Sequence, residues 1–300
     1  MKKVIVLLIY VVFLSFNILG KEKDEVSVFL EVELKSNGYV GETLTYNINL
    51  YSTSQEISDI TETRPFGVSD FKMIKGNVER LSDNKVKVKG KQYYKWNIGR
   101  YFIIPEKKGY FTVKGGEYEV FFPVVKIVED PWWGRRKSVV YDSFVLKAPD
   151  KKIKISPLPT NIKGENFSGA VGDFSVVSWL PPGTISKGKE AVAIIKISGN
   201  GLLENVEFPS LSQVFAENCK LKSIDRRENL SQENGNLVSE VVLECLFIPT
   251  SDKGETSVFQ FSFFNPYTKK YQTVSTEPQP WNNSDEYTPV DKSKLQIIEI

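Results

Sequence analysis

The residues that could carry chemistry are few, because histidine is absent from all 300 positions. The chain therefore lacks Ser-His-Asp and Cys-His catalytic sets, the usual zinc ligands and the commonest general base near neutral pH. Paired carboxylates remain, since a glycosidase needs only two. The pairs are Glu117 with Glu119 and Glu129 with Asp130, in alternating or turn-like segments typical of solvated strand faces. We predict a non-enzymatic protein without cofactor or metal, with a glycoside hydrolase as the enzymatic alternative.

One segment, residues 129–137, combines residue types typical of interaction surfaces. A proline and a glycine frame two tryptophans, and three cations follow. Trp and Arg are enriched at interface hot spots, and the same residues suit contact with a membrane surface at headgroup level. The alternative is an ordinary loop whose indoles fold back onto the protein. The candidate partner-binding residues are Trp132, Trp133, Arg135, Arg136 and Lys137.

The charge balance argues against nucleic acid as a partner. Lysine and arginine number 39 against 37 acidic residues, which leaves a net charge of +2. This balance creates no global field for a polyanion, so attraction would need a local patch.

The first 20 residues carry the signature of export. Lys2 and Lys3 precede an apolar run over residues 4–16, and small or polar residues follow before a charged stretch. The run is shorter than the about 20 residues of a spanning helix. We expect a cleaved signal peptide over residues 1–20, with a retained N-terminal anchor as the alternative. The protein would then work in the periplasm or at the outer face of the inner membrane.

Cys219 and Cys245 are the only cysteines. Export would place them in an oxidising compartment, where a disulfide is reasonable. The alternative is two small buried side chains that never meet.

Alternating apolar and polar residues indicate strands throughout the chain after the export signal. Residues 26–34 and 44–50 alternate as half-buried strands do. Gly, Pro, Asn, Ser and Asp interrupt the pattern at short intervals, as turns require. Residues 278–284 contain two prolines, several polar residues and a single tryptophan, and we expect them to form a loop. The pattern predicts an all-β fold.

A repeat of about 145 residues organises these strands. Gly41 and Gly188 are each followed by apolar residues at the third, fifth, seventh and ninth positions. Two more matches keep the same order: residues 102–105 with 246–249, each followed by a glycine, and 153–155 with 297–300. We predict two tandem immunoglobulin-like β-sandwich domains, residues 21–156 and 173–300, joined by a Pro/Gly linker over residues 157–172.

The C-terminal part of this linker continues into the second predicted domain, and residues 167–174 read Phe-Ser-Gly-Ala-Val-Gly-Asp-Phe. Gly169 and Gly172 permit backbone conformations that bulkier residues forbid. The segment is expected to be a tight turn with Phe167 packed as a plug, or a partner-binding loop.

These residues also carry a resemblance to a known family. The ordered set comprises residues 157–159, 167–174, 197–201, 208–209, 247–249, 261–266 and 271–273. Together they resemble the BatD family of bacterial oxygen tolerance, or aerotolerance, proteins, most strongly over residues 157–278. The resemblance implies an envelope protein with periplasmic β-sandwich modules that works with membrane proteins bearing von Willebrand factor A (VWA) domains and a MoxR-type ATPase. Many members continue into a C-terminal transmembrane helix, which this sequence lacks before it stops at Ile300.

Two functions follow as expectations. The first is an exported scaffold or adaptor that binds other envelope proteins and performs no catalysis. The second is a surface adhesin or carbohydrate-binding protein, in which exposed aromatic residues would stack on sugars.

Overall fold

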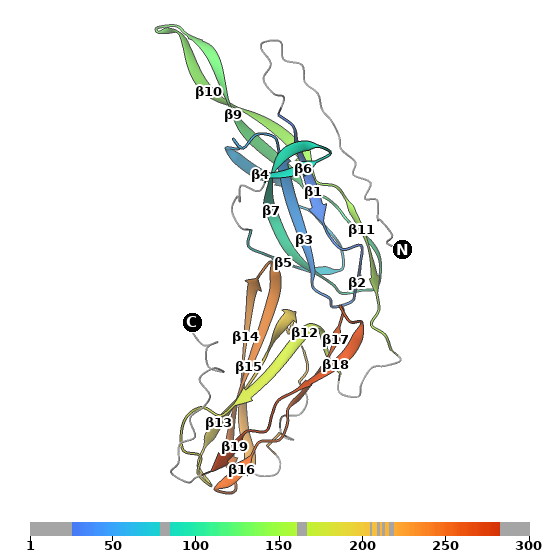
Figure 1. The fold of residues 1–300 in the computed structure, drawn as a ribbon, viewed down its shortest axis with the longest axis vertical. Helices are drawn as coiled ribbons and strands as arrows, with labels where there is room; N and C mark the ends of the chain where they lie inside the picture. The colour runs from blue at the N-terminus through green and yellow to red at the C-terminus, as the bar shows by residue number, and fades with distance from the viewer. Residues whose placement is uncertain are drawn as a thin grey trace.

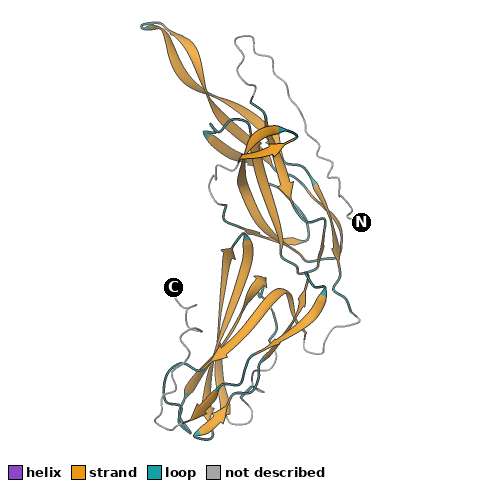
Figure 2. Cartoon of the chain, in the orientation of Figure 1, coloured by secondary structure: helices purple, strands orange, loops and turns teal. Residues whose placement is uncertain are grey.

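The computed structural model of the chain describes residues 26–78, 85–160, 167–204, 206–208, 211, 214–215 and 219–282. These residues form β-strands joined by turns and irregular segments, without an α-helix among them (Figures 1 and 2). The predicted all-β fold is confirmed. None of the described segments is a helix with the length and apolar character that a membrane crossing needs. The expected signal peptide, residues 1–20, lies outside the described residues.

Eleven strands in the first half of the chain form three sheets. The largest contains, in spatial order, β1 (Val28–Glu33), β3 (Leu44–Ser52), β7 (Lys91–Pro105) and β5 (Phe71–Lys75), with β6 (Lys85–Val88) also paired to β7. A second has the order β10 (Gly134–Lys147), β9 (Glu117–Asp130) and β4 (Asp59–Arg64). The third has the order β2 (Asn37–Tyr39), β11 (Lys151–Ser156) and β8 (Gly109–Val113).

The second half forms one large and one small sheet. The large sheet contains, in order, β14 (Cys219–Glu233), β15 (Asn236–Pro249), β13 (Ala191–Gly201), β12 (Phe167–Trp179), β17 (Gln260–Asn265) and β18 (Lys270–Ser275). Its neighbours are antiparallel except for β12 and β17, which are parallel. The small sheet pairs β16 (Lys253–Glu255) with β19 (Pro280–Asn282). Residues 278–284 are therefore not all loop, because Trp281 of β19 is buried in the core.

The buried apolar side chains fall into two clusters, one in each half. In the first, residues of the largest sheet such as Tyr46 and Ile103 pack against residues of the other two sheets such as Val120 and Ile153. The second gathers aromatic and aliphatic residues of β12, β13, β15 and β17. Burial of each large apolar side chain stabilises the fold by about 1.5–3 kcal/mol. The division into domains at residues 21–156 and 173–300 stays a prediction, because a domain is defined by its ability to fold independently.

The first two matches of the sequence repeat coincide with the same local structure in both halves. Gly41 and Gly188 both have positive φ, 81° and 76°, in the turn before β3 and β13. The Gly41 N–H donates to the Pro105 carbonyl at 2.9 Å, and the Gly188 N–H donates to the Pro249 carbonyl at 2.9 Å. The strand order β1-β3-β7-β5 also parallels β12-β13-β15-β14. The third match falls on residues 297–300, outside the described residues.

Candidate functional site

The segment with two tryptophans is the tip of a long hairpin formed by β9 and β10. The two strands pair without a register shift from Glu117 opposite Lys147 to Asp130 opposite Gly134. Gly134 has φ of 67°, a left-handed conformation that few other residues adopt at low cost. Because β4 pairs with β9 only as far as Phe121, the hairpin continues beyond that point as a two-stranded ribbon. Figure 1 shows this ribbon extending from one end of the molecule.

The base of the hairpin is fixed in the first core. Tyr118, Val120 and Phe122 alternate inward and are at most 4% exposed. The rings of Phe122 and Phe144 meet edge to face, with centroids 5.5 Å apart. The Tyr118 hydroxyl donates to the Glu62 carboxylate at 3.0 Å, and burial raises the pKa of this tyrosine. The distal ribbon is therefore carried on a rigid support.

One side of the distal ribbon presents an exposed apolar face, defined by Val125, Ile127, Val139 and Tyr141. Val125 lies directly opposite Val139, and Tyr141 and Ile127 are each two residues away from this pair along their strands. Directly opposite residues share a face of the sheet, and so do residues two apart. The four side chains are 57%, 68%, 57% and 62% exposed in the order named. Such a contiguous group marks an interaction site more often than a single exposed residue does.

The tip adds aromatic residues and charges. Trp132 is 89% exposed and Trp133 83%. Arg135 pairs with Glu129 at 3.5 Å, which links the two strands just behind the turn. The expected alternative, a loop whose indoles fold back onto the protein, is not what the structure has, because both indoles lie exposed at the tip of the hairpin, with Arg135, Arg136 and Lys137 exposed beside them. Binding of a partner by these residues stays a prediction.

The expected turn or loop around Phe167, Gly169 and Gly172 is wrong, because all three residues belong to strand β12. Residues 167–172 of the predicted linker are therefore part of a strand. Gly169, with φ of 89°, accommodates a register shift between β12 and β17. At Gly172 a Cβ atom would lie 2.2 Å from the Asn200 carbonyl oxygen, so glycine permits the close approach of β12 and β13.

Phe167 packs against a neighbouring ring, although it does not close a turn. Its ring meets Tyr271 edge to face at 5.0 Å, and the Tyr271 hydroxyl donates to the Pro159 carbonyl at 2.8 Å. Phe264 touches both Tyr271 and, across the two halves, Tyr39 of β2. Phe167 is thus linked to the junction between the halves through Tyr271 and Phe264, and all three predicted residues lie in β12, apart from the hairpin tip.

Three of the four paired carboxylates, Glu117, Glu119 and Glu129, have a local partner, and the side chain of Asp130 lies outside the described part of the structure. Glu117 pairs with Arg64 at 2.6 Å, and Glu119 accepts a hydrogen bond from the Ser143 hydroxyl at 2.6 Å. Glu129 is engaged by Arg135 as described above. These contacts are typical of solvated strand faces. Among the residues that the structure describes, no group of three or more His, Cys, Asp or Glu side chains is placed to hold a metal ion.

Cys219 and Cys245 are separate buried thiols, so the possible disulfide is not formed. Cys219 lies opposite Pro249, four residues along β15 from Cys245. This offset corresponds to about 13 Å, whereas the Cα atoms of a disulfide lie within about 7 Å. Burial raises the pKa of each thiol to about 11.

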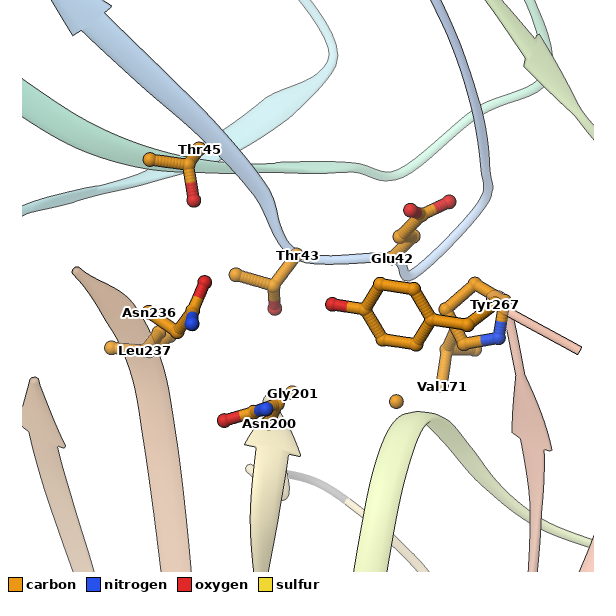
Figure 3. A pocket seen from close by; sticks show the side chains of 11 residues that line it. Glu42, Thr43, Thr45, Val171, Asn200, Gly201, Asn236, Leu237 and Tyr267 are labelled. Carbon is orange, nitrogen blue, oxygen red and sulfur yellow. The ribbon is translucent and has the colours of Figure 1, made fainter. Parts of the chain in front are cut away.

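A small polar pocket lies where the two halves meet (Figure 3). Its cavity of about 20 Å³ has room for about one water. Thr43 faces Asn200 and Asn236 across it, and the buried Thr43 hydroxyl has no hydrogen-bond partner. A second hollow of about 200 Å³, beside β14 and β15, is also below the usual size of a ligand pocket. The hairpin is therefore the stronger candidate site.

No family model matches the chain, and no curated protein matches it.

Sequence reasoning found the tip of the hairpin and missed its exposed apolar face. Residues 120–128 and 138–146 are rich in Val, Ile, Phe and Tyr, which predicts strands on both sides of the two tryptophans. That signal could have revealed a long hairpin. The exposure of Val125, Ile127, Val139 and Tyr141 could not be predicted, because it depends on how far β4 extends along β9.

Proposed function

We propose that the protein is an exported envelope scaffold or adaptor that binds another envelope protein through the β9–β10 hairpin and performs no catalysis. The observation that carries the proposal is the exposed apolar face on a ribbon that projects from a rigid base. Each large apolar side chain left in water forgoes about 1.5–3 kcal/mol of burial. A partner that covers Val125, Ile127, Val139 and Tyr141 would recover part of that free energy.

The nature of the partner follows from the residues that surround this face. Aromatic residues and arginines at the tip suit a protein interface, in which such side chains contribute most of the binding free energy. The resemblance to the BatD family supports a membrane protein with a VWA domain as the partner. The apolar run over residues 4–16 supports export to the periplasm or the outer face of the inner membrane.

Photo-crosslinking in intact bacterial cells tests this proposal. A photoreactive amino acid replaces Ile127 in the exposed apolar face, and a control replaces Val177, which is 53% exposed on β12 in the second half. We expect mass spectrometry to identify a VWA-domain membrane protein captured from position 127 and not from position 177. Recovery of no envelope protein, or the same proteins from both positions, would contradict the proposal.

Export itself is tested by sequencing the N-terminus of the mature protein. Removal of residues 1–20 would give a chain that begins at or near Lys21. A chain that keeps its first residues would favour the retained anchor.

The two exposed tryptophans favour a carbohydrate-binding protein as the second candidate function. Indole rings that are 89% and 83% exposed can stack on sugar rings. A glycan array separates the two functions. Binding that is lost when Trp132→Ala is combined with Trp133→Ala would support the carbohydrate function, and the absence of binding would remove it.

A further inference from the structure

Strand β10 has an open edge. It is the end strand of its sheet, and among the described residues it pairs with β9 alone. The pairing runs over 14 residues without a bulge. Between Ser138 and Leu146 the strand contains one charged residue, Asp142, and no proline. A long, regular edge strand of this kind can pair with a further strand through its main chain.

The other long edge strand of the molecule is protected in the usual ways. Strand β14 has a register shift between Leu221 and Ser223. It also exposes a series of charged side chains, namely Lys220, Lys222, Asp225, Arg226, Arg227 and Glu228. Bulges and charges are the features by which proteins prevent pairing between sheet edges. β10 has no register shift, and its segment between Ser138 and Leu146 carries a single charge, which sets this part of the edge apart.

We propose that β10 pairs antiparallel with β10 of a second copy of this chain, about a two-fold axis at Val139. Such a pairing joins the two hairpins into one four-stranded sheet. A two-fold axis perpendicular to the sheet keeps corresponding side chains on the same face, so odd-numbered residues lie opposite odd and even opposite even. The contact is then self-complementary, as a two-fold interface must be.

The charges of β10 select this register. With Val139 opposite Val139 of the second copy, Arg136 lies opposite Asp142 and Lys137 lies opposite Tyr141, each twice. Asp142 already pairs with Lys126 at 2.8 Å within the hairpin, so Arg136 of the second copy completes a network of two cations and one carboxylate. Centring the contact one residue earlier or later removes the Arg136–Asp142 pairing and leaves Asp142 opposite Gly134 or Ser138, without a cation. Opposite charges on facing strands stabilise the pairing of the strands, whereas a charge that faces an uncharged residue gains no such attraction.

The same register uses the exposed apolar residues of β10. Val139 meets its own counterpart on the axis, and Val145, which is 65% exposed, lies beside the tip of the other hairpin, where Trp133 is 83% exposed. The edge and the exposed apolar face are different surfaces, because edge pairing engages the main chain and leaves that face open. A dimer therefore presents two such faces side by side.

Cysteine crosslinking of the purified full-length mature protein tests the pairing. The Val139→Cys variant places two thiols directly opposite each other across the axis, within reach of a disulfide. The Val125→Cys variant is the matched control, because Val125 is equally exposed at 57% and lies opposite Val139, but on β9, one strand away from the contact. The native thiols of Cys219 and Cys245 are buried and contribute no background.

We expect the position-139 variant to form a covalent dimer under mild oxidation at least about tenfold faster than the position-125 variant. Equal rates for the two variants would overturn the proposal. The experiment needs no envelope partner, so its outcome is independent of the crosslinking in cells.

Sedimentation of the protein without added cysteines gives the second measurement. We expect a reversible monomer–dimer equilibrium that Asp142→Arg weakens by at least about tenfold, since this change places Arg opposite Arg136. Adding Arg136→Asp restores the charge complementarity and the dimer. Circular dichroism checks that both variants keep the β-sheet fold. A chain that stays monomeric, including one that instead sediments with anionic lipid vesicles, overturns the proposal.

Discussion

The described part of the chain contains two long hairpins, one in each half, and their surroundings differ. β9 and β10 have 14 residues each, and β14 and β15 have 15 and 14. β15 pairs with β13 on one side and β14 on the other, and its alternate residues are buried along its whole length. The outer part of β9–β10 has no third strand among the described residues. Similar strand-forming sequences thus build a core in one half and an exposed ribbon in the other.

The turns of the two hairpins also differ in whether they contact the rest of the protein. The β14–β15 turn contains Asn234 and Gly235, both with positive φ, a combination typical of a tight two-residue hairpin. Next to this turn, Gln232 exchanges two hydrogen bonds with the main chain of Asn77 in the first half. The β9–β10 turn carries Trp132 and Trp133 instead. One turn therefore joins the two halves of this chain, whereas the other is exposed to solvent.

The two hairpins should differ most in how far an introduced carboxylate lowers the free energy of unfolding. Val241 in β15 is 1% exposed, and Val125 in β9 is 57% exposed. Val241→Asp should lower the free energy of unfolding by more than about 4 kcal/mol, because an ionised carboxylate would lose its water in the core. Val125→Asp should change it by less than about 0.5 kcal/mol. Urea unfolding monitored by tryptophan fluorescence measures both, and similar losses would show that the ribbon is packed against other residues.

The next largest difference is expected in the rates at which the backbone amides of the two hairpins exchange their hydrogens. Amide groups in residues 124–140 open without disturbing a core, so at low protein concentration they should exchange at least about 100-fold faster than those of β13 and β15. Mass spectrometry of peptides from both regions measures the rates. Equal protection in the two hairpins would contradict the comparison.

A smaller effect is expected at the turn that joins the halves. Gln232→Ala removes hydrogen bonds of 2.7 and 2.9 Å to Asn77, which should lower the free energy of unfolding by about 0.5–1.5 kcal/mol. The matched control is Gln92→Ala, an exposed glutamine next to the β6–β7 turn in the first half, which should have no measurable effect. Chemical denaturation of the three proteins makes the comparison, and equal stability would mean that the junction relies on other contacts.

The smallest effect concerns the two thiols beside the β14–β15 hairpin. A reducing agent should shift the free energy of unfolding by less than about 0.5 kcal/mol, whereas loss of a disulfide would lower it by about 2–4 kcal/mol. Thiolate is the reactive form, so with a pKa of about 11 both thiols should be inert at neutral pH and react faster as the pH rises towards that value. An aromatic disulfide reagent counts them: none in the native protein at pH 7 and two after unfolding without reductant.

Sequence patterns predicted the strands well where one face is buried and the other is solvated. The alternation over residues 44–50 and the glycines at positions 41 and 188 correspond to β3 and to equivalent turns. Residues 167–172 were mistaken for a turn, because glycines inside a strand give the same signal as glycines in a loop. The pairs Pro131-Trp132 and Pro280-Trp281 look alike in sequence, yet Trp132 is 89% exposed and Trp281 6%. Packing against strands that are distant in the sequence decides whether each indole is buried, and a local sequence pattern carries no information about that packing.

The length of the ribbon also has an electrostatic consequence. From Phe121 to Asp130 the strand covers about 30 Å, at about 3.3 Å per residue. Charges in water at physiological ionic strength are screened over about 8 Å. A molecule that approaches the tip therefore encounters the field of the few charged residues beside the turn, and the nearly neutral body of the protein contributes little to its attraction or orientation.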